Sequence, residues 1–140
     1  MLLFIWQLPQ NIVALVMIPF LGKLKLVCER HYCFCFTGEN MQGGISLGNF
    51  AFVSKCMSYS ETEIAHEVNG HTVDSKIFGP LYLIVIGLPS LLNAIFDFTE
   101  CYYDFYTEIL ANKHAGLAVK KTKYGKKTYG TLYFKPGYKL

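Results

Sequence analysis

The chain has 140 residues, enough for one domain with one core. Hydrophobic residues make up 52% of it, the mean hydropathy is +0.28 and the formal net charge is only +3. Charged residues are 16%, against about a quarter in soluble domains, so the composition argues against an ordinary soluble domain and favours a membrane context. Five cysteines without a C-x-x-C pair exclude a disulfide scaffold and fit a reducing compartment.

Residues 1–22 carry no charged side chain, and Lys23, Lys25 and Arg30 follow them. This is the length and the flank of a membrane span, so an apolar membrane segment is predicted here. The segment is interrupted by Gln7, Pro9, Gln10, Asn11 and Pro19. A core helix broken near the first proline is therefore the alternative.

Residues 31–55 are predicted to form strands, with one or two hairpins, because glycine pairs separate short apolar runs. The alternation at Cys33 and Cys35 is typical of a strand with both cysteines on one face. Thiolate and imidazole are also zinc ligands, so a metal site is the alternative for this cluster. Its members are Cys28, His31, Cys33 and Cys35.

A helix is predicted over 60–76, because Ser60 and Glu63 form a capping box at its start. Residues 77–96 form an apolar segment of 20 residues without a charge, long enough to cross a bilayer as one helix. Gly87 and Pro89 lie near its middle and predict a bend there, so two short arms are the alternative to one span.

Acids spaced by three or four residues predict a helix over 97–115. Residues 117–140 form a basic tail with a predicted terminal hairpin, since eight lysines and no acid follow Glu108. Lysines beside aromatic residues and apolar segments favour contact with anionic lipid over contact with nucleic acid. A lipid-binding or nucleic-acid-binding module that uses this tail stays a further alternative.

The segment His66-Glu67-Val68-Asn69-Gly70-His71 contains the parts of a hydrolytic zinc site. In the H-E-x-x-H arrangement, histidines four apart bind one ion and the glutamate accepts a proton from water. Here the histidines are five apart, which rotates them by about 140° on a regular helix instead of about 40°. A π-bulge at Asn69-Gly70 would realign them. The alternative takes Glu67 and His71 as the ligands and leaves His66 out.

Glu108 is the predicted third metal ligand, and Asn112, four residues later, is predicted to hold the second nitrogen of a ligand histidine. The alternative places Glu108 on a solvated helix face. Asp74 either orients a ligand imidazole or is solvated. His31 and His114 are expected to have surface or structural roles.

If His66, His71 and Glu108 meet at one ion, both ends of segment 77–96 must come close to that ion. A straight helix of 20 residues would separate them by about 30 Å. The segment is therefore expected to fold back near residues 87–89 or to run obliquely beside the site.

Several of these motifs resemble those of a group of small bacterial membrane-associated proteins of the zincin type, with the pattern H-E-x-G-H, G-P-L-Y, G-x-P-S and F-Y-T-E-x-x-A. The matching elements here are His66-Glu67, Gly70-His71, residues 79–82, residues 87–90 and residues 105–112. The last element is also similar to that of gluzincin peptidases. The extra residue before Gly70 departs from the pattern. The resemblance implies Zn²⁺, a glutamate base and hydrolytic ancestry.

The sequence thus predicts a single α+β domain, membrane-associated and zincin-like, mostly helical with a short β-hairpin before the metal-site helix. His66, His71 and Glu108 would bind Zn²⁺, and Glu67 would activate water to hydrolyse a peptide or protein substrate. A bacterial inner-membrane location with the basic tail on the cytoplasmic side is expected. The alternative is a catalytically inactive, partner-binding membrane protein with the same architecture.

Overall fold

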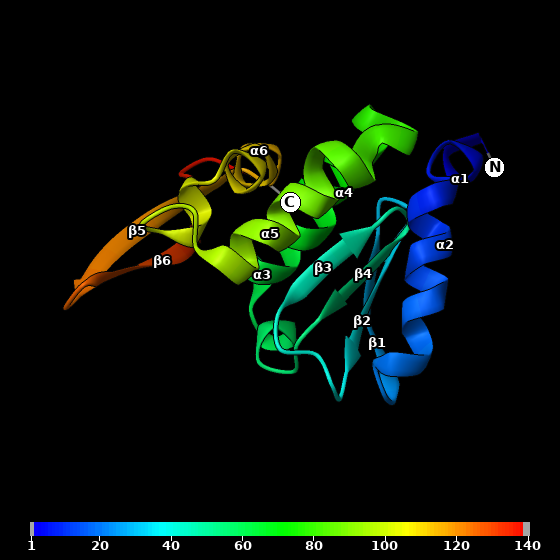
Figure 1. Ribbon diagram of the computed structural model, residues 1–140, viewed down its shortest axis with the longest axis horizontal. Coiled ribbons are helices and arrows are strands. Elements are labelled where there is room, and N and C mark those ends of the chain that lie inside the picture. Colours follow the sequence, from blue (N-terminus) through cyan, green and yellow to red (C-terminus); the bar gives the residue numbers. More distant parts are fainter. Residues whose placement is uncertain (1, 139–140) are drawn as a thin grey trace.

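The computed structural model describes residues 2–138 and has an α+β fold, as predicted (Figure 1). The helices are α1 (Leu2–Trp6), α2 (Leu8–Met17), α3 (Glu61–Ala65), α4 (Thr72–Phe78), α5 (Leu88–Phe96) and α6 (Tyr106–His114). Short 3₁₀ turns cover Ile18–Phe20, Met57–Tyr59, Gly79–Leu81 and Tyr102–Asp104, and π-helical turns cover His66–His71 and Leu83–Gly87. The strands are β1 (Leu24–Arg30), β2 (Cys33–Gly38), β3 (Gly44–Leu47), β4 (Phe50–Val53), β5 (Leu117–Tyr124) and β6 (Lys127–Phe134).

The first four strands form one sheet in the order β1-β2-β4-β3, in which β2 and β4 are parallel and the other neighbours are antiparallel. The expectation of a short hairpin over 31–55 was wrong in extent, because the sheet begins at Leu24. The charged residues that suggested a membrane flank lie in or next to β1, an edge strand. Edge strands tolerate charge because one side of the strand faces solvent.

Helices cover both faces of this sheet (Figure 1). On one face, Cys33 and Cys35 pack with Ile64 and Val68 of the predicted metal-site helix. On the other face, Phe52 packs with residues of α2. Both cysteines are fully buried, which confirms the predicted strand with its cysteines on one face.

The N-terminal segment turns its polar side inward and its apolar side outward. Gln7, Gln10 and Asn11 are fully buried, whereas Ile12 and Val16 are 51% and 62% exposed. The Asn11 Oδ1 accepts a hydrogen bond from the Asn49 backbone N–H at 2.8 Å, and Gln10 donates to the Gly79 carbonyl. The break falls at Gln7, two residues before Pro9, and Pro9 itself occupies the first turn of α2, where no N–H is needed.

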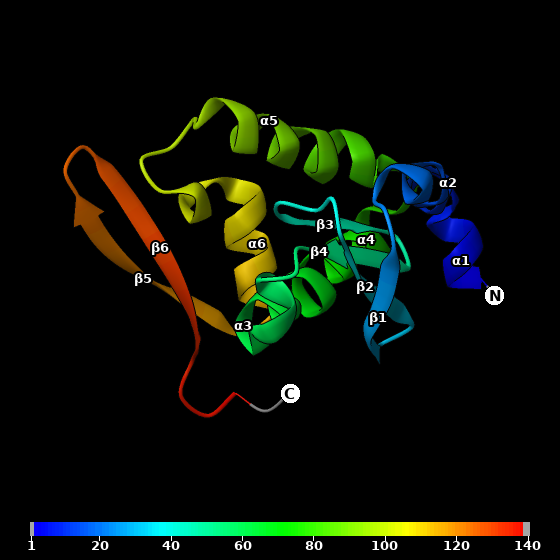
Figure 2. The same cartoon turned by 90° about the horizontal axis from the view of Figure 1, so that it is seen from below.

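Segment 77–96 bends at its start and not at its middle. Gly79 has φ +50° and ends α4, and the π-turn Leu83–Gly87 leads directly into α5 (Figure 2). The predicted bend near residues 87–89 was wrong. Pro89 lies in the first turn of α5, and the π-turn before it takes up the irregularity. Within residues 2–138, no helix has both the length and the apolarity that a bilayer crossing requires.

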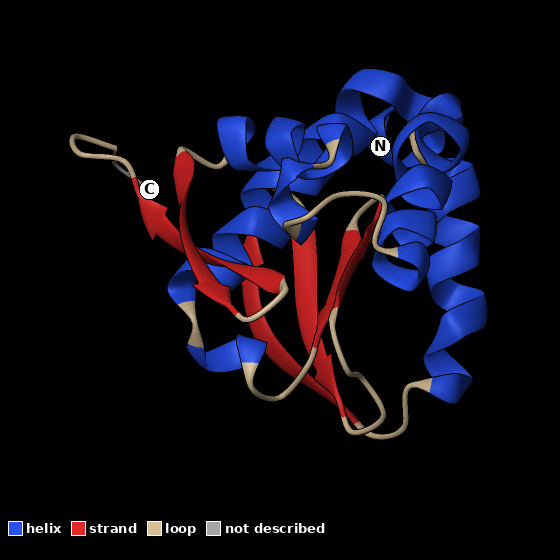
Figure 3. Cartoon of the chain, turned by 60° about the vertical axis from the view of Figure 1, so that its left-hand side comes forward, coloured by secondary structure: helices blue, strands red, loops and turns tan. Residues whose placement is uncertain are grey.

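The predicted helix over 97–115 was wrong in its first half. Asp97, in a left-handed conformation, ends α5, and α6 begins only at Tyr106. The acid Asp104 pairs instead with Lys121 at 2.8 Å. Lysines that were assigned to a basic tail lie on the predicted terminal hairpin β5–β6, a separate two-stranded sheet (Figure 3).

That hairpin belongs to the folded domain. Leu117 and Leu132 pack with Ala65, the last residue of α3, and with Ala115. The hairpin therefore supports the end of the helix from which the histidines project, and residues 117–138 are not a free tail. Residues 139–140 of the predicted tail lie outside the described part of the chain.

Candidate metal centre

The two histidines of the predicted motif project from a single π-turn, His66–His71, which joins α3 to α4. A π-turn is about one residue longer than an α-turn, so side chains five apart lie on the same side. The two imidazole rings meet edge to face with their centroids 4.9 Å apart. The predicted π-bulge is confirmed.

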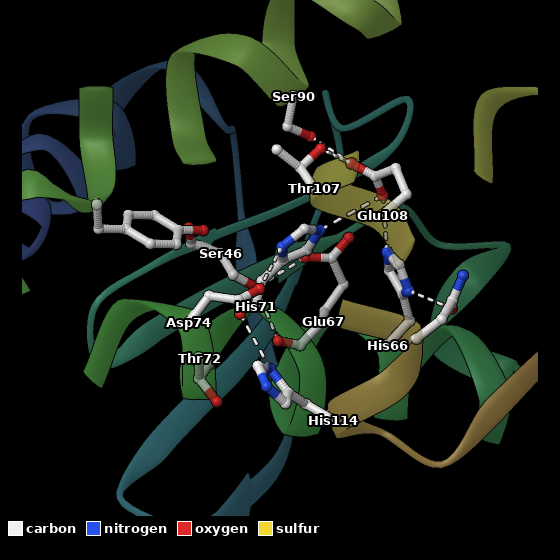
Figure 4. A network of polar contacts seen from close by, with 12 residues as sticks. Ser46, His66, Glu67, His71, Thr72, Asp74, Ser90, Thr107, Glu108 and His114 are labelled. Carbon is white, nitrogen blue, oxygen red and sulfur yellow. Dashed lines mark hydrogen bonds and ion pairs between the residues drawn. The ribbon is translucent and has the colours of Figure 1, made fainter. Parts of the chain in front are cut away.

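Glu108 of α6 is the third member of the cluster (Figure 4). Its Oε2 lies 3.0 Å from His66 Nε2 and 3.4 Å from His71 Nε2. All three side chains are buried, and Glu108 is fully so, which is the opposite of a solvated helix face. The structure therefore brings together the predicted set, and His66 is not outside it.

The donor set and its spacing fit a metal ion. Two imidazole nitrogens and one carboxylate oxygen are the three-ligand set of many catalytic zinc sites. In a tetrahedral site with ligands about 2.0–2.1 Å from zinc, the ligand atoms are about 3.3 Å apart. The observed 3.0 and 3.4 Å separations are close to this value. In residues 2–138, this is the single group of His, Cys, Asp or Glu with such geometry, so the cysteine cluster near Cys33 is not a second one.

Outer partners hold the ligands in place. Asn112 Oδ1 lies 2.9 Å from His66 Nδ1, so the predicted role of Asn112 is confirmed. The other carboxylate oxygen of Glu108, Oε1, accepts hydrogen bonds from Ser90 at 2.6 Å and from Thr107 at 3.0 Å. Ser90 belongs to α5, so segment 77–96 runs beside the site, the second of the two expected courses (Figure 2).

Glu67, the predicted base, lies in the same π-turn and is 5% exposed. Its Oε2 accepts a hydrogen bond of 2.7 Å from Ser46 of the edge strand β3. A Cβ at Gly44, in the same strand, would lie 2.1 Å from Glu67 Oε1. The glutamate thus rests against Gly44, where a larger residue would displace its carboxylate. Its role as a base stays a prediction.

The charged groups of the cluster shift one another's pKa values. Burial alone would raise the pKa of Glu108, but the contacts with His66 and His71 outweigh it and lower that pKa. Burial alone would lower the pKa of His71, but Asp74 and Glu108 outweigh it and raise that pKa well above its usual value. The two carboxylates beside His71 thus favour the protonated form of this imidazole.

The other two histidines differ in position, since His31 lies at the surface and His114 lies beside the buried Asp74. His31 is exposed and lies away from the site, with its carbonyl accepting a hydrogen bond from Lys76. Asp74 is fully buried beside His71, so it is not the solvated residue of the alternative. His114 Nδ1 lies 3.0 Å from Asp74 Oδ1.

Sequence reasoning missed Ser46 and Gly44 as neighbours of the site. Ser90 and Thr107 were noticed only as parts of the G-x-P-S and F-Y-T-E elements, without a role. The contacts of Ser46 and Ser90 join residues 21 and 18 positions apart, and a helical or strand period gives no signal for such pairs.

Comparison with known proteins adds no relative. No family model matches the chain, and neither a curated protein nor a solved structure matches it.

Proposed function

We propose that the chain is a membrane-associated, zinc-dependent hydrolase of the metallopeptidase type. The observation that carries the proposal is the convergence of His66 Nε2, His71 Nε2 and Glu108 Oε2, with a buried glutamate next to the first histidine. This arrangement supports zinc over magnesium or calcium, which prefer ligand sets made of oxygen atoms. The resemblance to bacterial zincins supports a peptide or protein as the substrate.

In the proposed reaction, zinc would supply Lewis-acid polarisation and would make a water molecule acidic near neutral pH. Glu67 would accept the proton of that water. Ser46 donates to Glu67 Oε2, and Oε1, which is free of that hydrogen bond, would accept the proton. Ser46 would thereby fix the direction in which the base points. Ser90 and Thr107 would hold Glu108 in place through its Oε1.

The experiment combines metal analysis with peptide hydrolysis. We expect one zinc per chain after purification without chelators, and cleavage of a peptide library that is detected by mass spectrometry. Glu67→Gln should retain zinc and reduce cleavage by about 10²–10⁴-fold, the usual contribution of a general base. Glu61→Gln, on the exposed face of α3, is the matched control and should cleave like the wild type. Wild-type protein without zinc would refute the proposal.

The second candidate is an inactive protein that keeps the cluster for structure or partner binding. It is favoured by burial, because the ligands and Glu67 are at most 5% exposed, as in a structural polar network. Zinc bound at one per chain, without cleavage of any library peptide, would support this candidate over the hydrolase.

Membrane association is proposed from the inverted orientation of the N-terminal helices. α1, α2 and residues 77–96 expose large apolar side chains. Gln10 of α2 donates to the Gly79 carbonyl, so α2 lies beside the start of segment 77–96. Helices that bury their amides and expose isoleucine and leucine are suited to an apolar neighbour. We propose the cytoplasmic face of a bacterial inner membrane, with Lys23 and Lys25 near anionic headgroups.

Flotation with anionic phospholipid vesicles tests this. Ile12→Asp in α2 should reduce binding, whereas Tyr129→Asp, at a similarly exposed site on the distant hairpin, should not. Equal flotation of the wild type and Ile12→Asp would contradict lipid contact through α2. Loss of flotation with Tyr129→Asp alone would shift the assignment to the lysine-rich hairpin. Nucleic-acid binding by the same hairpin would appear as a salt-sensitive gel shift.

A further inference from the structure

Asp74 occupies an unusual position for a carboxylate. It lies on α4, is fully buried, and its two oxygens lie between two histidines. Asp74 Oδ1 is 3.0 Å from His114 Nδ1, and Asp74 Oδ2 is 3.6 Å from His71 Nδ1. Among residues 2–138, none of these four atoms makes a hydrogen bond of regular geometry. An isolated buried charge is very costly, and the two imidazoles within ion-pair distance are the groups available to compensate the Asp74 carboxylate.

The two ligand histidines are held in parallel ways. Each directs Nε2 toward Glu108 and Nδ1 away from it, as Figure 4 shows for His71 and His66. An imidazole with a free Nε2 must carry its proton on Nδ1, and this proton needs an acceptor. Asn112 is the acceptor for His66. Asp74 Oδ2, 3.6 Å from His71 Nδ1, is the acceptor placed to take the corresponding role for His71.

His114 completes the arrangement from the last turn of α6. Its side chain is 23% exposed, so it reaches from the surface to the buried carboxylate. A donor on the second oxygen would fix the plane of the Asp74 carboxylate. Since Glu108 and Asn112 also lie on α6, this one helix would orient both ligand histidines.

We propose that Asp74 and His114 are positioning residues for His71. Asp74 accepts the Nδ1 proton of His71 and leaves Nε2 free for the metal, and His114 donates to Asp74 and holds it in place. The inference rests on the proposed metal site, but its first readout, the tautomer of His71, needs no metal.

The test uses Asp74→Asn and His114→Asn in the full chain, with Asp97→Asn and His31→Asn as matched controls at exposed positions. Nitrogen-15 NMR of the histidine rings reports which nitrogen of His71 carries the proton, at a pH where the ring is neutral. Competition with a chelator reports zinc affinity, and thermal unfolding reports the stability of the metal-free protein.

We expect the His71 proton on Nδ1 in the wild type and in both controls. In Asp74→Asn the amide can donate to Nδ1, so the proton should move toward Nε2, and zinc affinity should fall by about 10–100-fold. His114→Asn, at a partly exposed position, should fold and shift the tautomer and the affinity in the same direction by less. A merely structural role would lower metal-free stability and leave the tautomer unchanged.

An Asp74→Asn protein with the wild-type tautomer and zinc affinity would overturn the proposal. So would a wild type in which the His71 proton lies on Nε2. If the wild type bound no zinc while Asp74→Asn moved the proton, the proposed hydrolase would fail and the positioning pair would stand. Zinc binding without peptide cleavage would also count against the hydrolase alone.

Discussion

Replacing Gly70 by alanine tests how closely the histidine turn must approach α6. A Cβ at Gly70 would lie 2.7 Å from the Ala111 carbonyl oxygen and 2.9 Å from its Cβ. Ordinary contacts begin near 3.4 Å, so relief requires α6 to move by about 0.7 Å. The opposing oxygen belongs to the backbone, so a side-chain rotation cannot relieve the clash.

A movement of α6 should displace Glu108, the proposed metal ligand on that helix. Glu108 lies three residues before Ala111 on α6, and a metal site tolerates only about 0.2 Å of error in ligand distance. Overpacking of this kind costs about 1–3 kcal/mol, and each 1.4 kcal/mol is about tenfold in affinity. Alanine also gains about 1 kcal/mol over glycine in a helix. We therefore expect the free energy of unfolding of metal-free Gly70→Ala to fall by at most about 2 kcal/mol. Its zinc affinity should fall at least about tenfold.

Chemical denaturation of the metal-free protein and zinc titration against a chelator measure the two effects. Gly87→Ala is the control, because its Cβ would meet nothing closer than 3.6 Å and should stabilise the helix without changing zinc affinity. If Gly70→Ala bound zinc like the wild type and gained stability like the control, the close approach to α6 would not set the ligand geometry.

Three further predictions concern the base, the pH response and the thiols. Gly44→Ala should displace the Glu67 carboxylate, so that peptide cleavage falls at least tenfold while zinc binding persists; equal loss of both would refute this. The pKa of His71 is raised on folding, so its stabilisation of the metal-free protein is complete below about pH 6.5 and is lost as pH rises through the folded value. The gain in melting temperature from zinc should grow over the same range, because zinc needs neutral His71, and a flat gain would contradict this. Burial raises the pKa of Cys33 to about 12, so alkylation with mass-spectrometric mapping should label exposed Cys56 first, and equal rates would argue against the buried strand.

The convergence of the two histidines was predictable because helix geometry is local. The five-residue spacing of His66 and His71 admits few solutions that keep both rings together, and the weak helix formers Asn69 and Gly70 indicate where the ladder lengthens. The pairing of Asn112 with a histidine followed from its position one turn after Glu108. Such relations need only the period of the helix.

Other features of the structure could not be predicted from the helical or strand periodicity of the sequence. Ser46 reaches the site because an edge strand packs against the π-turn, and that register is set by the whole sheet. The polar residues of α2 suggested an imperfect span, because average hydropathy does not reveal which side of a helix faces inward. Asp97 continued a helical spacing of acids but ends α5 in a left-handed conformation, which aspartate tolerates better than most residues.

The π-turn also changes what an insertion means in this helix. One added residue normally rotates everything after it by about 100°, and would turn α4 away from its neighbours. Here the longer turn absorbs the added residue between Glu67 and His71, so the residues after His71 keep their phase relative to that histidine. A version shortened by one residue at Asn69 could close the same turn as a regular α-helix. The helix can thus differ in length by one residue between such versions while the two imidazoles stay on the same side.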